Sequence, residues 1–256
     1  PFHLEAYGQT TVNYNRDIEI FPVVEAMFHR IFGKCPYKSP TDMGVNMVGN
    51  AIIDDEACCD ASRQEIIRRY YSASCTVRQG LSDGNDVRKW ELIMSSAGIS
   101  TEQRKPVAAS LAVAEKTSSP AVAIELLDGT MITGKTSSLL GASSAALLNA
   151  LKVLAGIDDR IHLISPTVIE PIQKLKVGHM GNHNPRLHTD EILIALSICA
   201  VTDENAAAAM KQLEKLRGCE AHSTVILSRV DENVFHKLGV NITCEPQYQS
   251  KKLYHA

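Results

Sequence analysis

The 256-residue chain has almost no excess charge and no long apolar run. Its 26 basic residues against 29 acidic ones give a formal net charge of −3, so the whole protein has no field that would attract nucleic acid or an anionic membrane. Its longest apolar stretches, such as 192–201, are too short to cross a bilayer. The start also lacks the basic and apolar segments of a secretory signal. We therefore expect a cytoplasmic protein that binds neither nucleic acid nor membrane.

Cysteine is too scarce and too irregularly spaced for a disulfide framework. The seven cysteines are an odd number, which favours reduced thiols in a reducing compartment. Hydrophobic residues make up 45% of the chain and charged residues 21%, values that exclude a disordered or collagen-like protein. The length allows one large domain or two ordinary ones, and we expect a sizeable core.

Apolar spacing in the first part of the chain predicts helices. Residues 17–32 place apolar side chains on one helix face. Early acids and later arginines predict a long helix over 54–79, and two more helices are expected at 86–97 and 100–116. The intervening residues 35–50 are rich in Pro, Gly, Asn, Asp and Ser, which predicts a loop with a functional role.

Short β-rich runs begin after residue 120. The runs 121–127 and 130–134 flank Asp128 and Gly129, a pair typical of a tight hairpin turn. Helices and strands then alternate, which indicates an α/β layered domain whose later strands run largely parallel. In chain order we expect helix 137–155, strand 161–165, helices 167–177, 189–200 and 204–217, strand 223–228, helix 231–238 and strand 240–244.

The predicted fold class is α/β, with a mainly α-helical subdomain over 1–110 and a three-layer α/β subdomain over 111–256. The element order of the second subdomain is similar to that of the cytidine-deaminase-like core. Such enzymes bind zinc through His-x-Glu and Pro-Cys-x-x-Cys at the starts of two core helices. The corresponding positions here, 136–139 and 165–168, read TSSL and SPTV, so the zinc motif is absent and deaminase chemistry does not follow.

Residues 129–136, GTMITGKT, match the spacing of a phosphate-binding loop. That loop must turn its backbone N–H groups inward around phosphate. The intervening Thr, Met, Ile and Thr favour an extended strand instead, and Gly129 already belongs to the predicted turn. We therefore favour the second strand of a hairpin. Lys135 and Thr136 remain candidate anion ligands, because we expect them next to a helix N-terminus.

Residues 179–190 bring histidine, asparagine and charged side chains together between two predicted helices. Their spacing matches no zinc signature, and we predict no metal site. Two interpretations remain. The segment is either a solvated loop followed by first-turn acids, or a site in which Arg186 binds an anion while His188 and Asp190 transfer protons.

Cys219 and His222 form another candidate pair. A thiolate and an imidazole can serve as nucleophile and base, although a buried structural cysteine is more common. Asp42, Asn46 and Asn50 are spaced four residues apart, and we interpret them as candidates for positioning a substrate. A structural network of turns is the alternative for these three residues.

Five phrases along the chain identify a family: FHLEAYG at 2–8, YKSPTDMGVN at 37–46, RQEIIRRYY at 63–71, NPRLHTDE at 184–191 and LRGCEAH at 216–222. Together they resemble the uncharacterised bacterial family catalogued as domain of unknown function 1846. The resemblance implies that the chain is the C-terminal half of a longer protein, with Pro1 an internal position. It implies a missing N-terminal half that resembles a nucleotide-binding domain and would bind a nucleoside triphosphate with magnesium. It brings no catalytic residues.

The first functional hypothesis is an enzyme that acts on a nucleotide or another phosphorylated small molecule. Convergence of Arg186, His188, Asp190 and Cys219 in one pocket would support it. The alternative is a non-enzymatic module for ligand sensing or oligomerisation. Its homo-oligomer interface would lie on the two helices predicted within 54–97.

Exposed aromatic side chains would favour the oligomerisation module. Tyr70, Tyr71 and Trp90 lie on these predicted helices. Aromatic residues are enriched in protein interfaces, so we expect these three on an exposed face if the chain is a homo-oligomer.

Overall fold

The computed structural model describes residues 15–40 and 54–249, without the side chains of residues 15–18. The chain divides into two compact units, Pro1–Gln103 and Arg104–Ala256. The predicted boundary at residue 110 falls inside helix α5 (Lys105–Thr117), which belongs to the second unit. Pro106 in the first turn of α5 explains this helix start, because proline fits that position without losing a hydrogen bond. None of the described helices is long and apolar enough to span a bilayer.

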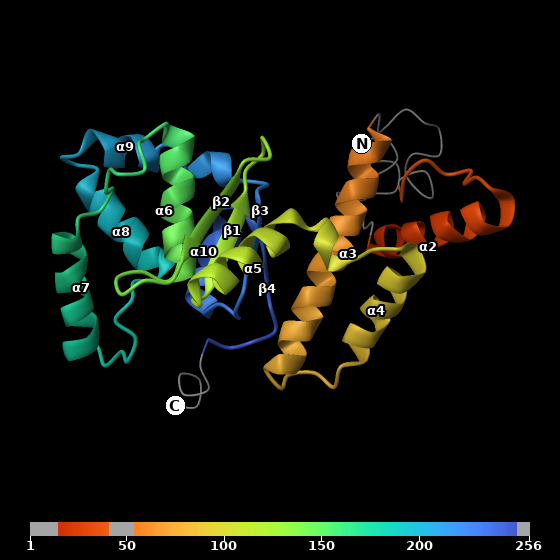
Figure 1. Cartoon of the computed structure of the whole chain (residues 1–256), viewed down its shortest axis with the longest axis horizontal. Helices are drawn as coiled ribbons and strands as arrows, with labels where there is room; N and C mark the ends of the chain where they lie inside the picture. Colours follow the sequence, from red (N-terminus) through yellow and green to blue (C-terminus); the bar gives the residue numbers. More distant parts are fainter. Residues whose placement is uncertain (1–14, 41–53, 250–256) are drawn as a thin grey trace, which may run out of the picture. The chain divides into compact units, whose positions relative to one another are not determined.

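Three helices pack on one another in the described part of the first unit, α2 (Asn15–Phe32), α3 (Asp55–Arg78) and α4 (Asn85–Ala97) (Figure 1). A 3-10 turn, η2 (Thr101–Gln103), follows α4. Asp54 caps α3 by accepting a hydrogen bond from the Ala57 N–H at 2.9 Å. The helices predicted over 17–32, 54–79 and 86–97 are thereby confirmed, because local periodicity and end signals agree with the packing.

Two of the aromatic side chains expected on an exposed face are buried. Tyr71 is 4% exposed and Trp90 7% exposed. Arg69 and Lys89 lie over the Trp90 ring, 5.5 Å and 4.5 Å from its centroid. Tyr71 and Trp90 therefore do not form the exposed aromatic surface that would favour an assembly role. Their rings stabilise the packing of the first unit instead.

The second unit contains a four-stranded mixed sheet in the order β2-β1-β3-β4. Strand β1 (Ala121–Glu125) is antiparallel to β2 (Met131–Lys135) and to β3 (Glu220–Ser223), whereas β3 is parallel to β4 (Asn241–Cys244). The predicted hairpin is confirmed, with Gly129 in its turn at φ 83°. Residues 131–135 are extended strand, so the segment that matches a phosphate-loop pattern has no such loop there.

The structure corrects three of the predicted elements. Residues 161–165 form no strand, so the cytidine-deaminase-like order lacks this element; Ser165 instead caps helix α7 (Pro166–Gly178). The strand predicted at 223–228 lies earlier, as β3, and ends at Ser223. There the Ser223 Oγ donates to the Val225 carbonyl, and the chain turns. The helix predicted over 204–217 is α9 (Glu204–Met210) followed by the 3-10 turn η3 (Leu213–Leu216).

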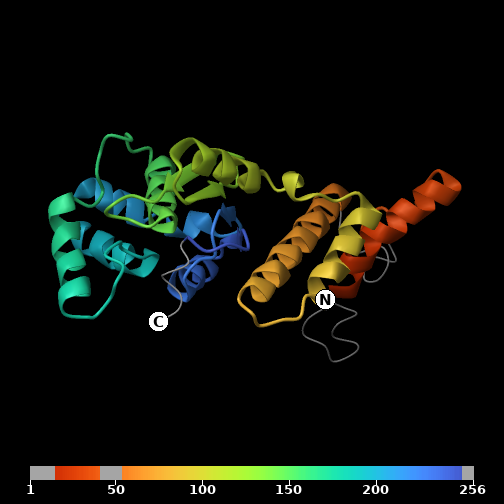
Figure 2. The ribbon, with the colours of Figure 1, turned by 60° about the horizontal axis from the view of Figure 1, so that its bottom comes forward.

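Helices cover both faces of the sheet and give the second unit three layers (Figures 1 and 2). Strand alternation separates the two faces. Val122 and Ile124 of β1 and Ile132 of β2 face α6 (Ala142–Ala155) and belong to the main hydrophobic core. Glu125 lies on the opposite face and pairs with Lys105 of α5 at 2.7 Å. The mixed α/β class predicted from the sequence is confirmed.

Gly134 lets β2 approach α6 closely. A Cβ at this position would lie 2.1 Å from the backbone nitrogen of Ala146. We expect Gly134→Ala to lower the free energy of unfolding by about 1–3 kcal/mol or more, because backbone atoms must move to relieve the clash. Chemical denaturation followed by circular dichroism measures this effect.

Gly178→Ala is the matched control. Gly178 ends α7, and a Cβ added there would meet no neighbouring atom within 4 Å. This substitution should therefore leave stability within about 1 kcal/mol of the wild type. Equal effects of the two substitutions would contradict the packing role of Gly134.

Candidate functional site

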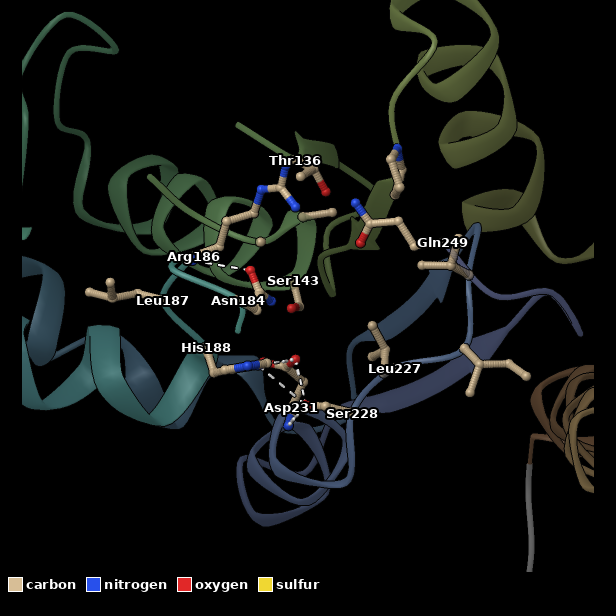
Figure 3. Close-up of a pocket in the computed structure, with 15 residues that line it drawn as sticks. Thr136, Ser143, Asn184, Arg186, Leu187, His188, Leu227, Ser228, Asp231 and Gln249 are labelled. Atoms are coloured by element: carbon tan, nitrogen blue, oxygen red, sulfur yellow. Dashed lines mark hydrogen bonds and ion pairs between the residues drawn. The ribbon is translucent and has the colours of Figure 1, made fainter. Parts of the chain in front are cut away.

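A pocket lies where the N-termini of three helices approach one another in the second unit (Figure 3). These helices are α6, α8 (Thr189–Cys199) and α10 (Arg229–Lys237). Gly141 precedes α6, His188 precedes α8 and Ser228 precedes α10, and all three residues line the pocket. The N-termini of α8 and α10 are capped by side chains and carry acidic residues in their first turns, whereas α6 has neither. The first N–H groups and partial positive charge of α6 therefore favour an anionic ligand at this end of the pocket.

The backbone on both sides of His188 is held by a buried lysine. Lys176 is 2% exposed, and its Nζ donates to Glu191 Oε2 at 2.7 Å and to the Arg186 carbonyl at 2.8 Å. Glu191 Oε2 also accepts from the His188 N–H at 2.7 Å, as expected for an acid three residues after a helix cap. These bonds fix the short segment that carries Arg186 and His188 into the pocket.

His188 forms an ion pair with a buried carboxylate. His188 Nδ1 lies 3.0 Å from Asp231 Oδ2, and Asp231 is 5% exposed. The hydrogen bond to Asp231 raises the pKa of His188 above its usual value, although burial acts in the opposite direction. Burial acts to raise the pKa of Asp231, but the hydrogen bond from His188 and those from Thr189 and Ser228 lower it below the usual value. The site therefore stabilises an imidazolium next to a carboxylate.

Ser228 supports this pair and is not placed as a nucleophile. Its Oγ donates to Asp231 Oδ2 at 2.8 Å and lies 3.3 Å from His188 Nδ1. In a Ser-His-Asp triad the serine and the aspartate bind opposite ring nitrogens, whereas here both lie at Nδ1. His188 Nε2 has no hydrogen-bond partner within 15–40 and 54–249, so it is the ring nitrogen that a ligand can reach.

Arg186 supplies a second positive group to the pocket. The side-chain Nε of Arg186 donates to the Ser137 carbonyl at 2.7 Å, and the backbone N–H of Arg186 donates to Asn184 Oδ1 at 3.2 Å. In the part of the chain that the structure describes, no carboxylate pairs with the Arg186 guanidinium, and both Nη atoms remain available as donors. The pocket thus combines a guanidinium with a histidine whose protonated form is stabilised.

The structure brings some of the predicted site residues together. Arg186, His188 and Thr136 line the pocket. Asp190 does not; its Oδ1 accepts from the Glu191 N–H at 2.8 Å, as a first-turn acid of α8. Lys135 ends β2 as an exposed residue and is not among the lining residues. The candidates Asp42, Asn46 and Asn50 lie outside the described residues.

Cys219 and His222 are not brought together. Cys219 belongs to the core on the α6 side, and burial raises the pKa of its thiol. His222 lies on the other face of the sheet, where Nδ1 is 2.8 Å from Thr243 Oγ1 and Nε2 is 3.2 Å from Glu245 Oε1. Burial lowers the pKa of His222, which favours the neutral ring. Cys219 and His222 therefore do not form the predicted pair of nucleophile and base.

Sequence reasoning missed Asp231, Ser228 and Ser143. The spacing of Ser228 and Asp231 is a known helix-start pattern and could have placed the start of α10 at residue 229. It could not have shown that Asp231 meets His188, which lies 43 positions earlier. Ser143 has no local signal, because it reads as an ordinary residue of an Ala-rich helix. Within the described ranges no three His, Cys, Asp or Glu side chains form a group that could hold a metal ion.

Two family models match the chain. Residues 1–98 match the model described as domain of unknown function DUF1846, N-terminal, and residues 102–254 match its C-terminal counterpart. The match of residues 1–98 to the N-terminal model therefore corrects the expectation that the chain corresponds to the C-terminal half alone.

The curated relatives agree with this assignment. The UPF0371 proteins of Corynebacterium urealyticum and Streptococcus thermophilus are each 56% identical over 254 residues, which is 99% of this chain and 51% of theirs. The UPF0371 protein of Corynebacterium diphtheriae is 56% identical over 253 residues, with the same coverage. The chain spans about half the length of these relatives. On the two family matches and these identities, the chain belongs to the DUF1846 family of bacterial proteins.

Proposed function

We propose that the pocket of the second unit binds a small anionic molecule and exchanges a proton with it. His188 is the general acid and base, and Asp231 is its positioning residue. The observation that carries this proposal is the His188–Asp231 pair at 3.0 Å, with Nε2 without a hydrogen-bond partner among the described residues and Arg186 lining the same pocket. Histidine titrates near neutral pH, so it can give and take a proton under ordinary conditions.

Each residue has a distinct role in this proposal. Asp231 accepts a hydrogen bond from the Nδ1–H group and sets the orientation of the ring, which leaves Nε2 to donate to the ligand or to accept from it. Arg186 attracts the negative charge of the ligand. A phosphorylated small molecule or a nucleotide fits this combination, because its charge is met by a guanidinium and by the N-terminus of α6.

The family resemblance implies a nucleoside triphosphate with magnesium. We propose this ligand for the whole protein only, because the chain spans about half the length of the curated relatives. A ligand-sensing module would use the same pocket without turnover. The His188–Asp231 pair favours the enzyme over that alternative, since simple anion binding needs no oriented imidazole.

Asp231→Asn should lower the pKa of His188. Asparagine keeps an oxygen that can accept the Thr189 N–H, but it removes the negative charge that stabilises the imidazolium, while burial of the ring remains. NMR titration of the histidine side chains measures the pKa, with His188→Asn to assign the resonance. An unchanged His188 pKa in Asp231→Asn would contradict the role of Asp231.

The same pair gives stability a defined pH dependence. A histidine whose pKa is raised by folding stabilises the fold fully below its unfolded pKa, and this stabilisation is lost as the pH rises through the folded pKa. An aspartate whose pKa is lowered by folding loses its contribution as the pH falls through its folded pKa. The difference in stability between wild type and Asp231→Asn should therefore be largest at weakly acidic pH, between the titrations of the two groups, and shrink toward both lower and higher pH. Denaturation midpoints measured across that range provide the check.

A thermal-shift screen against phosphorylated metabolites and nucleotides tests ligand binding. A compound that binds the pocket should raise the melting temperature of the chain, and Arg186→Gln should remove the shift. Arg217→Gln is the matched control, because Arg217 is exposed and is not among the lining residues. Stabilisation that is equal in both variants would contradict binding at this pocket.

A further inference from the structure

The N-terminus of α6 is open toward the pocket. Its N-cap is Gly141, which has no side chain to accept a hydrogen bond, and no acidic residue lies in the first turn. The first N–H groups of a helix have no partner within the helix. In the described chain no group accepts from the N–H of Ala142 or Ser143, and both residues line the pocket. The 14-residue helix thus presents donors to this space.

Ser143 adds a buried hydroxyl to these donors. It is 3% exposed and lines the pocket, yet its hydroxyl forms no hydrogen bond with any described residue (Figure 3). The next residue differs, because Ser144 Oγ donates to the Leu187 carbonyl at 2.9 Å. The Ser143 hydroxyl is therefore a donor at the pocket wall that no described residue uses, and a ligand in the pocket can accept a hydrogen bond from it.

Arg186 completes the set of donors. Its two Nη atoms have no partner in the part of the chain that the structure describes, and the guanidinium lines the same pocket as Ser143. Asp231 is the acidic residue among the lining residues, and its carboxylate accepts hydrogen bonds from Thr189 and Ser228 and pairs with His188. An anion next to Ser143 and Arg186 therefore meets donors and is not opposed by an unpaired carboxylate.

We propose that the N-terminus of α6, the Ser143 hydroxyl and the Arg186 guanidinium form a subsite for the phosphoryl group of a small phosphorylated molecule. A phosphoryl group has three strong acceptor oxygens, whereas a carboxylate has two. The available donors are two backbone N–H groups, one hydroxyl and a guanidinium, which suits the larger number. This inference rests on the proposed function, because it names the ligand class that His188 would act upon.

Inorganic phosphate is the probe that tests the subsite. Calorimetric titration of the chain should show saturable binding, and Arg186→Gln should weaken it roughly tenfold or more, because a hydrogen bond to a charged group is lost. Ser143→Ala should weaken it roughly threefold or more through loss of a single hydroxyl donor. Arg217→Gln should bind phosphate as the wild type does.

Three results would overturn the subsite. They are equal phosphate affinity in Ser143→Ala, Arg186→Gln and Arg217→Gln, binding of acetate as tight as that of phosphate, and no saturable binding at all. Circular dichroism melting of each variant separates a lost ligand contact from a lost fold. A variant that binds weakly while melting as the wild type does supports the proposal.

The His188 titration separates this inference from the proposed function. A raised His188 pKa without phosphate binding would leave the acid–base role standing and remove the subsite. Phosphate binding that depends on Ser143 and Arg186, with a His188 pKa that does not respond to Asp231→Asn, would support the subsite and contradict the acid–base role.

Discussion

Arg104→Met is expected to lower the free energy of unfolding of the second unit by about 3–5 kcal/mol, the usual cost of removing one partner of a buried ion pair. Arg104 is fully buried at the start of α5, and its guanidinium pairs with Glu220. Its Nε donates to Thr243 Oγ1 at 2.9 Å, and Nη2 donates to the Ala221 and Asn241 carbonyls at 2.8 Å and 2.7 Å. Methionine fills similar space but leaves these acceptors without their donor.

Hydrogen exchange of peptides over 220–244 measures this loss directly. Trp90, the single tryptophan, lies in the first unit, so its fluorescence does not report on the second unit. Lys105→Met is the matched control, because the Lys105 side chain is 71% exposed where it pairs with Glu125. An exposed ion pair contributes at most about 1 kcal/mol, so the control should stay close to the wild type. Similar exchange in both variants would contradict the role of Arg104.

His188→Asn should reduce turnover by about 10²–10⁴-fold for a phosphorylated compound found in the thermal-shift screen, the usual contribution of a general acid–base group. Asparagine retains a polar side chain but cannot exchange a proton near neutral pH. Binding should be largely kept, because Arg186 and the α6 N-terminus remain. The loss should therefore appear in kcat rather than in KM.

Conversion of that compound is followed by phosphorus NMR and mass spectrometry. His236→Asn is the matched control, since His236 lies in the last turn of α10 and is exposed. Turnover that survives His188→Asn would contradict the acid–base role. A compound that binds through Arg186 and is never converted would instead favour the ligand-sensing alternative.

Local sequence signals predicted much of the fold. Apolar periodicity and end signals identified the helices of the first unit, and Asp128 and Gly129 identified the hairpin. The extended preference of residues 130–133 correctly outweighed the phosphate-loop spacing. The prediction failed at residues 161–165, where a short apolar run reads equally as strand or as buried loop. The pairing that decides between them involves residues far away in the chain.

The candidate site was predicted only in part, because its residues also come from distant parts of the chain. Arg186 and His188 stand close together in a polar segment, so the sequence alone drew attention to both. Asp190 does not line the pocket, because nearness in sequence does not bring two side chains to the same place. The structure pairs His188 with Asp231 and directs Asp190 to its own helix turn.

Local sequence determined most of the helices, the hairpin and three residues of the pocket, Thr136, Arg186 and His188. Tertiary structure alone decided that three helix N-termini meet, that Ser143 and Arg186 line one pocket, and that Cys219 and His222 face opposite sides of the sheet. Helix and turn formation depends on neighbours a few residues apart. A binding site depends on how layers stack, which is set by burial of apolar surface over the whole unit.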